Sequence, residues 1–244
     1  MRVGVYGLGR FGAFWARVLS EHKLEVYGYS RHPKDPIDGV TIVSEDEVLS
    51  CDVIFLCVAI SSFSEVVERI KDKIKPGALV MDTCSVKLYP SDIMQKRLSN
   101  KCSLIATHPM FGPDSGKNGV KGLPMIICPL SAPVVEVSKW SRLFQGWGLR
   151  VIRMTCDEHD RQAAWSQGIT HLVGRVLDGM DLRDTPIATT GFLALRAVEE
   201  QTCHDPLQLF YDLQRYNPYT REMRQSFHQS VEKIMKDLKN QEQL

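Results

Sequence analysis

Short apolar runs alternate with amphipathic segments over the first 155 residues of the chain. Each run has the length and composition of a buried strand. The predicted strands are residues 2–6, 24–29, 52–59, 78–82, 103–106, 124–128 and 150–154. Apolar side chains at helical spacing predict helices that begin near residue 10, that carry Val66, Val67, Ile70 and Ile74, and that cover 132–147. This alternation is typical of an α/β domain with a parallel sheet covered on both faces.

The pattern changes after Thr155, because no convincing strand follows. Helices are predicted at about 158–180, at 205–216 and at the C-terminal end. The last helix carries a wide apolar stripe made by Met223, Phe227, Val231, Ile234 and Leu238. A small helical domain that exposes such a stripe usually buries it against a second copy, so we expect a homodimer formed through the C-terminal helices. The predicted domains are residues 1–155 and 156–244.

Composition and charge exclude several classes of protein. The chain has 244 residues, of which 43% are hydrophobic and 24% charged, as in ordinary globular proteins. A net charge of +1 gives no electrostatic attraction to nucleic acid or to a membrane surface, so neither is expected as a partner. The apolar stretches are too short to span a bilayer. Met1 leads directly into a strand pattern and leaves no room for a signal peptide, so we expect a cytoplasmic protein.

The seven cysteines show no CxxC or other metal-ligand spacing, so no metal site is expected. Their odd number fits a reduced protein without structural disulfides. Cys57 and Cys128 lie in apolar strand patterns, where cysteine usually serves as a small buried hydrophobe.

A glycine-rich segment follows the first predicted strand and opens the first helix. Its sequence is Gly7-Leu8-Gly9-Arg10-Phe11-Gly12. In that setting the three glycines permit a tight turn, a close approach of backbone to pyrophosphate, and close helix–strand packing. The helix N-terminus supplies N–H donors to the phosphates. The sequence therefore predicts a Rossmann-type dinucleotide-binding domain whose cofactor contacts are these six residues and Cys57; the alternative is a glycine turn without a ligand.

The end of the second strand reads Gly28-Tyr29-Ser30-Arg31. An NAD-selective site would place a carboxylate near Ser30, to bind the ribose 2′-hydroxyl and repel a 2′-phosphate. Ser30 and Arg31 instead donate hydrogen bonds to phosphate, and a guanidinium also stacks on adenine. NADP is therefore the predicted cofactor, with an Arg31 that is only a solvated loop charge as the alternative.

Two segments are expected near the nicotinamide, because both follow strands of the predicted sheet. The first is 82–87, in which Ser85 and Lys87 are placed to orient a ring or an anion. The second is 107–113, which puts His108 in a loop between two prolines, just after the strand 103–106. Such a fixed imidazole at a strand's carboxyl end is suited to chemistry. A His-Pro pair that only marks a turn is the alternative.

Three polar residues share one face of the predicted helix 158–180. Gln167, His171 and Arg175 recur at intervals of four residues on an otherwise small and apolar helix. Buried polar groups need partners, and a polar substrate would provide them. We therefore predict that these residues bind substrate. A structural hydrogen-bond network within the protein is the alternative.

The order and spacing of five motifs resemble the prephenate/arogenate dehydrogenase family of tyrosine biosynthesis, and most closely its compact plant-type branch. The motifs are GLGRFG, DTCSVK, THPMFGPDSGKNG, CDEHDRQAAWSQGITHLVGRVL and TPIATTGF. The resemblance implies a nucleotide-binding domain followed by a helical dimerisation domain. It also implies oxidative decarboxylation of prephenate or arogenate. The family's catalytic histidine falls on His108, and its serine falls on Ser85.

Two segments depart from the family pattern. Many bacterial members have an arginine in a GFRDxTR-like segment that binds a substrate carboxylate, whereas this chain reads GFLALR at 191–196. Arg196 is a possible substitute. Arogenate-specific relatives tend to have an acidic residue in the segment 185–190, where this chain has Ala188. An acid there would pair with the ammonium group of arogenate, so Ala188 favours prephenate slightly.

Two other functions are compatible with a glycine-rich NADP site. One is a different two-domain NADP oxidoreductase, such as a β-hydroxyacid dehydrogenase or an imine or F420 reductase, which usually places a lysine near the hydride. The other is an NADP-binding sensor without turnover, which would need neither His108 nor Ser85. The preferred substrate, inhibition by tyrosine and the exchange of elements between subunits stay open.

Overall fold

The computed structural model describes residues 1–242 of the chain. The chain divides into two compact units, Met1–His159 and Asp160–Leu244. The predicted boundary at 155/156 lies four residues before this division. The expected order, an α/β unit followed by a helical unit, is confirmed.

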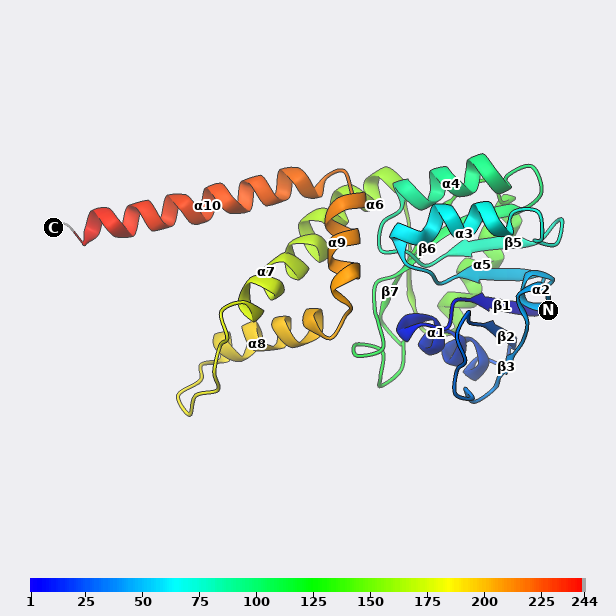
Figure 1. Cartoon of the computed structure of the whole chain (residues 1–244), viewed down its shortest axis with the longest axis horizontal. Coiled ribbons are helices and arrows are strands. Elements are labelled where there is room, and N and C mark those ends of the chain that lie inside the picture. Colours follow the sequence, from blue (N-terminus) through cyan, green and yellow to red (C-terminus); the bar gives the residue numbers. More distant parts are fainter. Residues whose placement is uncertain (243–244) are drawn as a thin grey trace. The chain divides into compact units, whose positions relative to one another are not determined.

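The first unit contains an eight-stranded sheet with the order β3-β2-β1-β4-β5-β6-β7-β8 (Figure 1). The strands are β1 Arg2–Tyr6, β2 Glu25–Tyr29, β3 Val40–Ile42, β4 Val53–Leu56, β5 Leu79–Asp82, β6 Ser103–Pro109, β7 Pro124–Pro129 and β8 Arg150–Arg153. Seven of them match predicted strands. The short edge strand β3 was not predicted; it has only three residues, and two of their side chains are exposed.

The sheet is mixed, whereas an all-parallel sheet was predicted. β6 and β7 pair antiparallel, with His108 opposite Ile126, and all other neighbouring strands pair parallel. The reason lies in the connection, since no helix occurs between Pro109 and Pro124. A parallel neighbour needs a crossover, usually a helix, whereas an antiparallel neighbour is reached by a loop.

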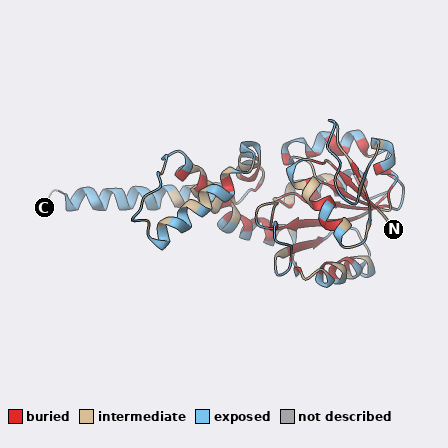
Figure 2. Cartoon of the chain, turned by 90° about the horizontal axis from the view of Figure 1, so that it is seen from below, coloured by how far each residue is buried: buried red, intermediate tan, exposed pale blue. Residues whose placement is uncertain are grey.

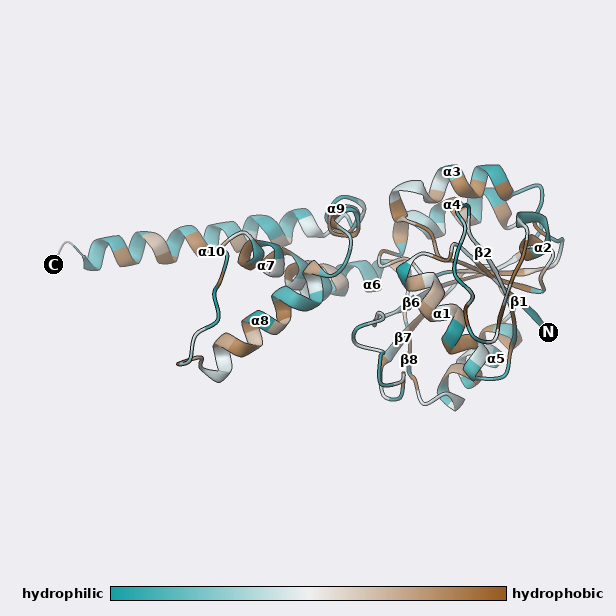
Figure 3. Cartoon of the chain, turned by 60° about the horizontal axis from the view of Figure 1, so that its bottom comes forward, coloured by the Kyte–Doolittle hydropathy of each residue, from teal (hydrophilic) through white to brown (hydrophobic). Residues whose placement is uncertain are grey.

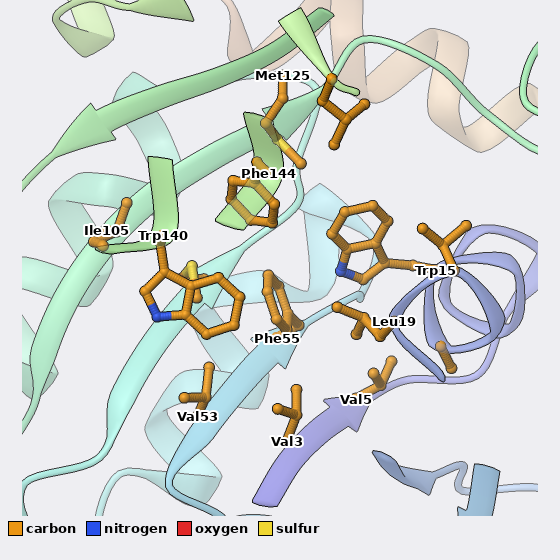
Figure 4. Close-up of a cluster of buried hydrophobic side chains, with 14 of the residues drawn as sticks. Val3, Val5, Trp15, Leu19, Val53, Phe55, Ile105, Met125, Trp140 and Phe144 are labelled. Carbon is orange, nitrogen blue, oxygen red and sulfur yellow. The ribbon is translucent and has the colours of Figure 1, made fainter. Parts of the chain in front are cut away.

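Helices cover both faces of the sheet (Figure 1). They are α1 Arg10–Glu21, α2 Glu45–Leu49, η1 Ile60–Ser62, α3 Phe63–Ile70, α4 Leu88–Leu98 and α5 Val134–Gly146. The core between α1, α5 and the sheet is strongly aromatic: Trp15 packs edge-on against Phe55, and Phe55 edge-on against Trp140 (Figure 4). α4 was not predicted, because its apolar and polar residues do not separate cleanly onto two faces.

The second unit is helical within the described residues 160–242. Its elements are α6 Cys156–Ala163, which begins in the first unit, the π-helical segment η2 Ala164–Gly168, α7 Ile169–Asp178, α8 Thr190–Cys203, α9 Leu207–Tyr216 and α10 Thr220–Gln241. The predicted helix 158–180 is therefore interrupted by a π-turn, and α8 is an additional helix. No helix in the described chain is both long enough and apolar enough to cross a membrane.

The long helix α10 is largely exposed along its C-terminal half (Figure 2). Its apolar residues recur between polar ones (Figure 3). Exposed members of this series are Val231, Ile234, Met235 and Leu238. Phe227 is half-buried and Met223 is fully buried, so the predicted stripe begins inside the unit and continues on its surface.

Candidate functional site

The glycine-rich turn between β1 and α1 is built by close backbone contacts. Gly7 has a φ of +105°, and a Cβ there would lie 2.4 Å from the carbonyl oxygen of Cys57. A Cβ on Gly12 would lie 1.8 Å from the carbonyl oxygen of Gly7. Both positions therefore exclude any side chain, as a tight turn and close helix–strand packing require. Cys57 lines this turn, and its thiol accepts a hydrogen bond from Thr83 Oγ1 at 3.4 Å.

Gly9 differs from the other two glycines, because no atom of the described chain beyond its immediate neighbours in the sequence lies within 4 Å of the position that its Cβ would take. Gly9 is the N-cap of α1, and no side chain caps that helix end. The first turn of α1 contains no acidic residue. An open space in front of uncapped amide groups fits a bound pyrophosphate, so the residues present suit a dinucleotide.

Leu8 and Phe11 take structural positions in this segment. The Leu8 side chain is fully buried, and its backbone N–H donates to the Tyr29 carbonyl at 3.2 Å. Its predicted cofactor contact is therefore not supported, because its amide is already used. Phe11 stacks on Trp15 with ring centroids 6.2 Å apart, which places its ring against the aromatic core.

Arg10 and Asp114 form an ion pair between the first turn of α1 and the loop after β6. The same loop packs on α1 through apolar contacts, since Phe111 meets the ring of Phe14 edge-on. A Cβ on Gly116 would lie 2.5 Å from the Phe14 ring. The loop that continues from His108 is thus attached to the helix that opens the dinucleotide turn.

The end of β2 presents a hydroxyl and a guanidinium, as the sequence predicted. Ser30 is half-buried, and its Oγ accepts a weak hydrogen bond from His32 N at 3.4 Å. Arg31 is exposed, and no hydrogen bond or ion pair ties its side chain to the described part of the chain. Tyr29, the last residue of β2, packs against Tyr6 with ring centroids 5.0 Å apart.

His108 lies inside β6 and not in a loop, which corrects the prediction. β6 continues to Pro109 because β7 pairs with it there, opposite Met125. Pro109 has no N–H to donate, and this is tolerated because β5 has already ended at the partner of Ala106 and leaves that side of β6 without a neighbouring strand at Pro109. β5 ends where Asp82 pairs with Ala106, so the period-two alternation of a strand puts Asp82 and His108 on the same face of the sheet.

A second histidine fixes the ring of His108. Nδ1 of His108 lies 2.8 Å from Nε2 of His159, and the ring planes are inclined at 64°. Both residues are 2% exposed. His159 belongs to the first turns of α6, whose start is organised by a reciprocal pair: Thr155 Oγ1 accepts from Glu158 N, and the Glu158 carboxylate accepts from Thr155 N. His159 is not among the predicted site residues, although it is the histidine of the CDEHDRQ motif.

Ser85 and Lys87 follow β5, but only Ser85 is accessible. Ser85 is half-buried three residues after the end of the strand. Lys87 is fully buried, forms an ion pair with Asp82, and donates to the Thr107 carbonyl. This geometry favours a structural role for Lys87 over the predicted contact with substrate, because its ammonium is already satisfied.

In the helical unit, all three predicted substrate-binding residues have a buried polar atom without a partner in the described chain. The atoms are Oε1 of Gln167, Nδ1 of His171 and Nε of Arg175. Burial and the neighbouring Arg175 lower the pKa of His171 to about 4, so the ring is neutral at physiological pH. Arg175 is partly used, because its guanidinium donates to the carbonyl of Thr202, near the end of α8, and to that of Asp205, just beyond it.

The family model of the prephenate dehydrogenase nucleotide-binding domain matches residues 16–153. The chain belongs to the prephenate dehydrogenase family. A second model, the TYRAAT1-like C-terminal domain, matches residues 176–244. Prephenate dehydrogenases are oxidoreductases, and the first match makes the α/β unit a nucleotide-binding domain.

Two curated relatives are arogenate dehydrogenases 1 and 2 of Arabidopsis thaliana, both described as chloroplastic. They are 34% and 31% identical over 98% of this chain. The chain spans 39% of the length of the first and 70% of the second. A prephenate dehydrogenase from A. aeolicus, solved with hydroxyphenyl propionate and NAD+, has the same fold. Its TM-score is 0.78 at 19% identity, covering 99% of this chain and 91% of that one.

The segments in which this member departs from the family pattern, 185–190 and 191–196, lie just before α8 and in its first turns. Thr189 caps the helix, since its Oγ1 accepts from Phe192 N at 3.2 Å. Arg196 pairs with Glu199 at 2.7 Å, so its charge is balanced within the helix. Arg196 is therefore a poor replacement for the carboxylate-binding arginine of the bacterial members.

Proposed function

We propose that this prephenate dehydrogenase family member catalyses the NADP-dependent oxidative decarboxylation of prephenate to 4-hydroxyphenylpyruvate, or of arogenate to tyrosine. The observation that carries the proposal is the buried pair of His108 and His159 at the end of β6. The loop after His108 leads directly to α1, where Arg10 meets Asp114. A base and a dinucleotide turn are thereby joined by one loop.

His108 is the proposed general base. The substrate carries a hydroxyl on C4 of a non-aromatic ring and a carboxylate on C1. Bound NADP would supply the acceptor for the hydride that leaves C4, and His108 takes the hydroxyl proton as C4 is oxidised. The electron pair of the breaking bond between C1 and the carboxylate then enters the ring and reaches the C4 oxygen, which His108 reprotonates. Carbon dioxide leaves, and the gain of aromaticity drives the reaction forward.

This role determines the tautomer of His108. A base that accepts at Nε2 must carry its own proton on Nδ1, and Nδ1 faces His159 Nε2 at 2.8 Å. His108 therefore donates to His159, and the second ring holds the first in the reactive tautomer. A general base of this kind contributes about 10²–10⁴-fold in rate. Ser85 is proposed to hydrogen-bond the same hydroxyl and align it.

Substrate contacts in the helical unit are proposed at Gln167 and His171. Their unpartnered buried atoms support this assignment, since such atoms are costly unless a ligand satisfies them. The neutral His171 ring acts as a hydrogen-bonding group and not as a cation. Ala188 offers no partner for an ammonium group, which favours prephenate over arogenate.

NADP is the proposed cofactor because Ser30 and Arg31 replace the carboxylate of an NAD site. Arg31 is exposed without an ion pair in the described chain, so its guanidinium is available to a 2′-phosphate. Comparison of KM for NADP and NAD tests this assignment directly.

A homodimer through the C-terminal helices is proposed from the exposed apolar residues of α10. Val231, Ile234, Met235 and Leu238 are each at least 44% exposed. Sedimentation should give twice the chain mass, and replacement of Ile234 and Leu238 by glutamate should give monomers.

All seven cysteines are free thiols, which supports a reducing compartment such as the cytoplasm.

The deciding experiment is formation of reduced cofactor with prephenate and with arogenate, followed by absorbance at saturating NADP. Turnover with either substrate supports the proposal, and the ratio of the two kcat/KM values assigns the substrate. Absence of turnover with both would reject it in favour of another NADP oxidoreductase or a sensor. His108→Asn should lower kcat about 10²–10⁴-fold and leave NADP binding intact.

A further inference from the structure

A buried ion pair contacts the backbone of Thr107, the residue before His108. Asp82 is the last residue of β5, and Lys87 lies five residues further on, just before α4. Both side chains are completely inaccessible. Removal of two charges from water is costly, and an apolar pair of similar volume is often as stable, so a buried ion pair needs an explanation other than stability.

The two side chains bind the backbone of Thr107 at the place where a residue of β5 would otherwise pair with it. The parallel ladder between β5 and β6 ends at the partners Asp82 and Ala106, so Thr107 has no β5 residue opposite it. Thr107 N donates to Asp82 Oδ1 at 3.2 Å, and Lys87 Nζ donates to the Thr107 carbonyl at 2.5 Å. The carboxylate thus stands where the next strand residue would accept, and the ammonium stands where it would donate.

The bond from Lys87 acts on the peptide group that carries His108. The Thr107 carbonyl and the His108 nitrogen belong to one planar unit, so a bond to that oxygen fixes the plane from which the His108 residue starts. Thr107 Oγ1 also donates to the Asp82 carbonyl, and Cys84 N donates to Asp82 Oδ2 at 3.0 Å. The backbone of the segment 82–87, which contains Ser85, thereby holds the Asp82 carboxylate in place.

We propose that Asp82 and Lys87 are positioning residues for His108, acting through Thr107. The ion pair anchors the backbone on the β5 side, β7 anchors it on the other side, and His159 anchors the ring. This inference rests on the proposed function of His108 as the base, and it replaces the contact between Lys87 and substrate that the sequence predicted.

Two double variants separate hydrogen bonding from charge. Asp82→Asn with Lys87→Gln removes both charges but keeps an acceptor for Thr107 N and a donor for its carbonyl. Asp82→Leu with Lys87→Met removes both bonds at similar volume. The exposed pair Lys101–Asp72 provides the matched control as Lys101→Gln with Asp72→Asn.

The expected result is a tenfold or greater fall in kcat for the Leu/Met variant, with KM for NADP and for the substrate unchanged. The Asn/Gln variant should recover most of the loss, and the control should match the wild type. A rise in the substrate KM with unchanged kcat would instead show Lys87 to be a substrate ligand and overturn the proposal. Thermal unfolding followed by circular dichroism identifies any variant that does not fold.

A readout independent of turnover keeps the two proposals distinguishable. The ring protons of His108 are assigned by nuclear magnetic resonance from their loss in His108→Asn. In the Leu/Met variant these signals should shift and broaden, and in the Asn/Gln variant they should stay in place. A wild type without turnover would reject the proposed function alone, whereas unchanged His108 signals in a folded Leu/Met variant would reject the positioning role.

Discussion

Nδ1 of His108 lies 2.8 Å from Nε2 of His159, and the two buried rings connect the end of β6 to the start of α6. A hydrogen bond between two imidazoles fixes the tautomer of each, because one nitrogen must donate and the other accept. The base proposed at His108 therefore depends on a residue 51 positions further along the chain.

Replacement of His159 by leucine should lower kcat about 10–100-fold, since His108 would keep its place on β6 but lose the acceptor for its Nδ1 proton. His159→Asn, which retains an acceptor oxygen, should lose less. Steady-state kinetics with saturating NADP measures both. The exposed His228 offers a matched control as His228→Leu. Equal activity of His159→Leu and the wild type would remove His159 from the mechanism.

Replacement of Arg31 by alanine should raise KM for NADP about tenfold and leave KM for NAD unchanged, because only NADP carries the 2′-phosphate. Initial-rate kinetics with the two cofactors checks the split. Lys34→Ala removes a nearby exposed charge and should leave both values unaltered. An equal loss for both cofactors would point to stacking on adenine and not to phosphate recognition.

The glycines of the turn allow a second test of the cofactor site. Gly9→Ala adds a methyl group to open space, so Tm should stay unchanged while the dinucleotide binds about tenfold more weakly. Gly12→Ala would force a contact of 1.8 Å with the Gly7 carbonyl and should lower Tm by several degrees. Calorimetric unfolding with and without NADP measures both effects. If Gly9→Ala bound NADP as tightly as the wild type does, the pyrophosphate would have to bind elsewhere.

The sequence was sufficient where local chemistry determines structure. The glycine turn, seven strands and the long C-terminal helix follow from apolar periodicity and from backbone demands within a few residues. Contacts between distant segments were beyond its reach. The pairing of β6 with β7 puts His108 in a strand, and Lys87 becomes a buried partner of Asp82 only once the sheet is assembled. His159 was missed because nothing in its own segment indicates which ring it meets.

The ion pair between Arg10 and Asp114 should oppose dinucleotide binding, because Asp114 binds the Arg10 guanidinium beside the N-terminus of α1, where the phosphates would bind. Asp114→Asn should therefore tighten NADP binding about twofold to fivefold, in line with the strength of a partly exposed ion pair. The gain should vanish in an Arg10→Gln background. Titration of intrinsic fluorescence with NADP in the four proteins of this cycle measures the coupling. If Asp114→Asn alone bound NADP more weakly, the Asp114 carboxylate would help to hold the loop closed and would not compete with the dinucleotide for Arg10.

The buried His171 should make the free energy of unfolding fall as the pH falls. Burial lowers its pKa from 6.5 to about 4, so between these values the unfolded chain binds a proton that the folded ring does not. Because unfolding then takes up a proton, stability is lost at up to about 1.4 kcal/mol per pH unit across this window. Urea unfolding at pH 7 and pH 5 measures the loss, and His171→Gln should show a loss smaller by about 1–2 kcal/mol. Substrate that binds the neutral ring should stabilise the folded protein further. Identical pH profiles for the two proteins would instead mean that the ring is solvated in solution.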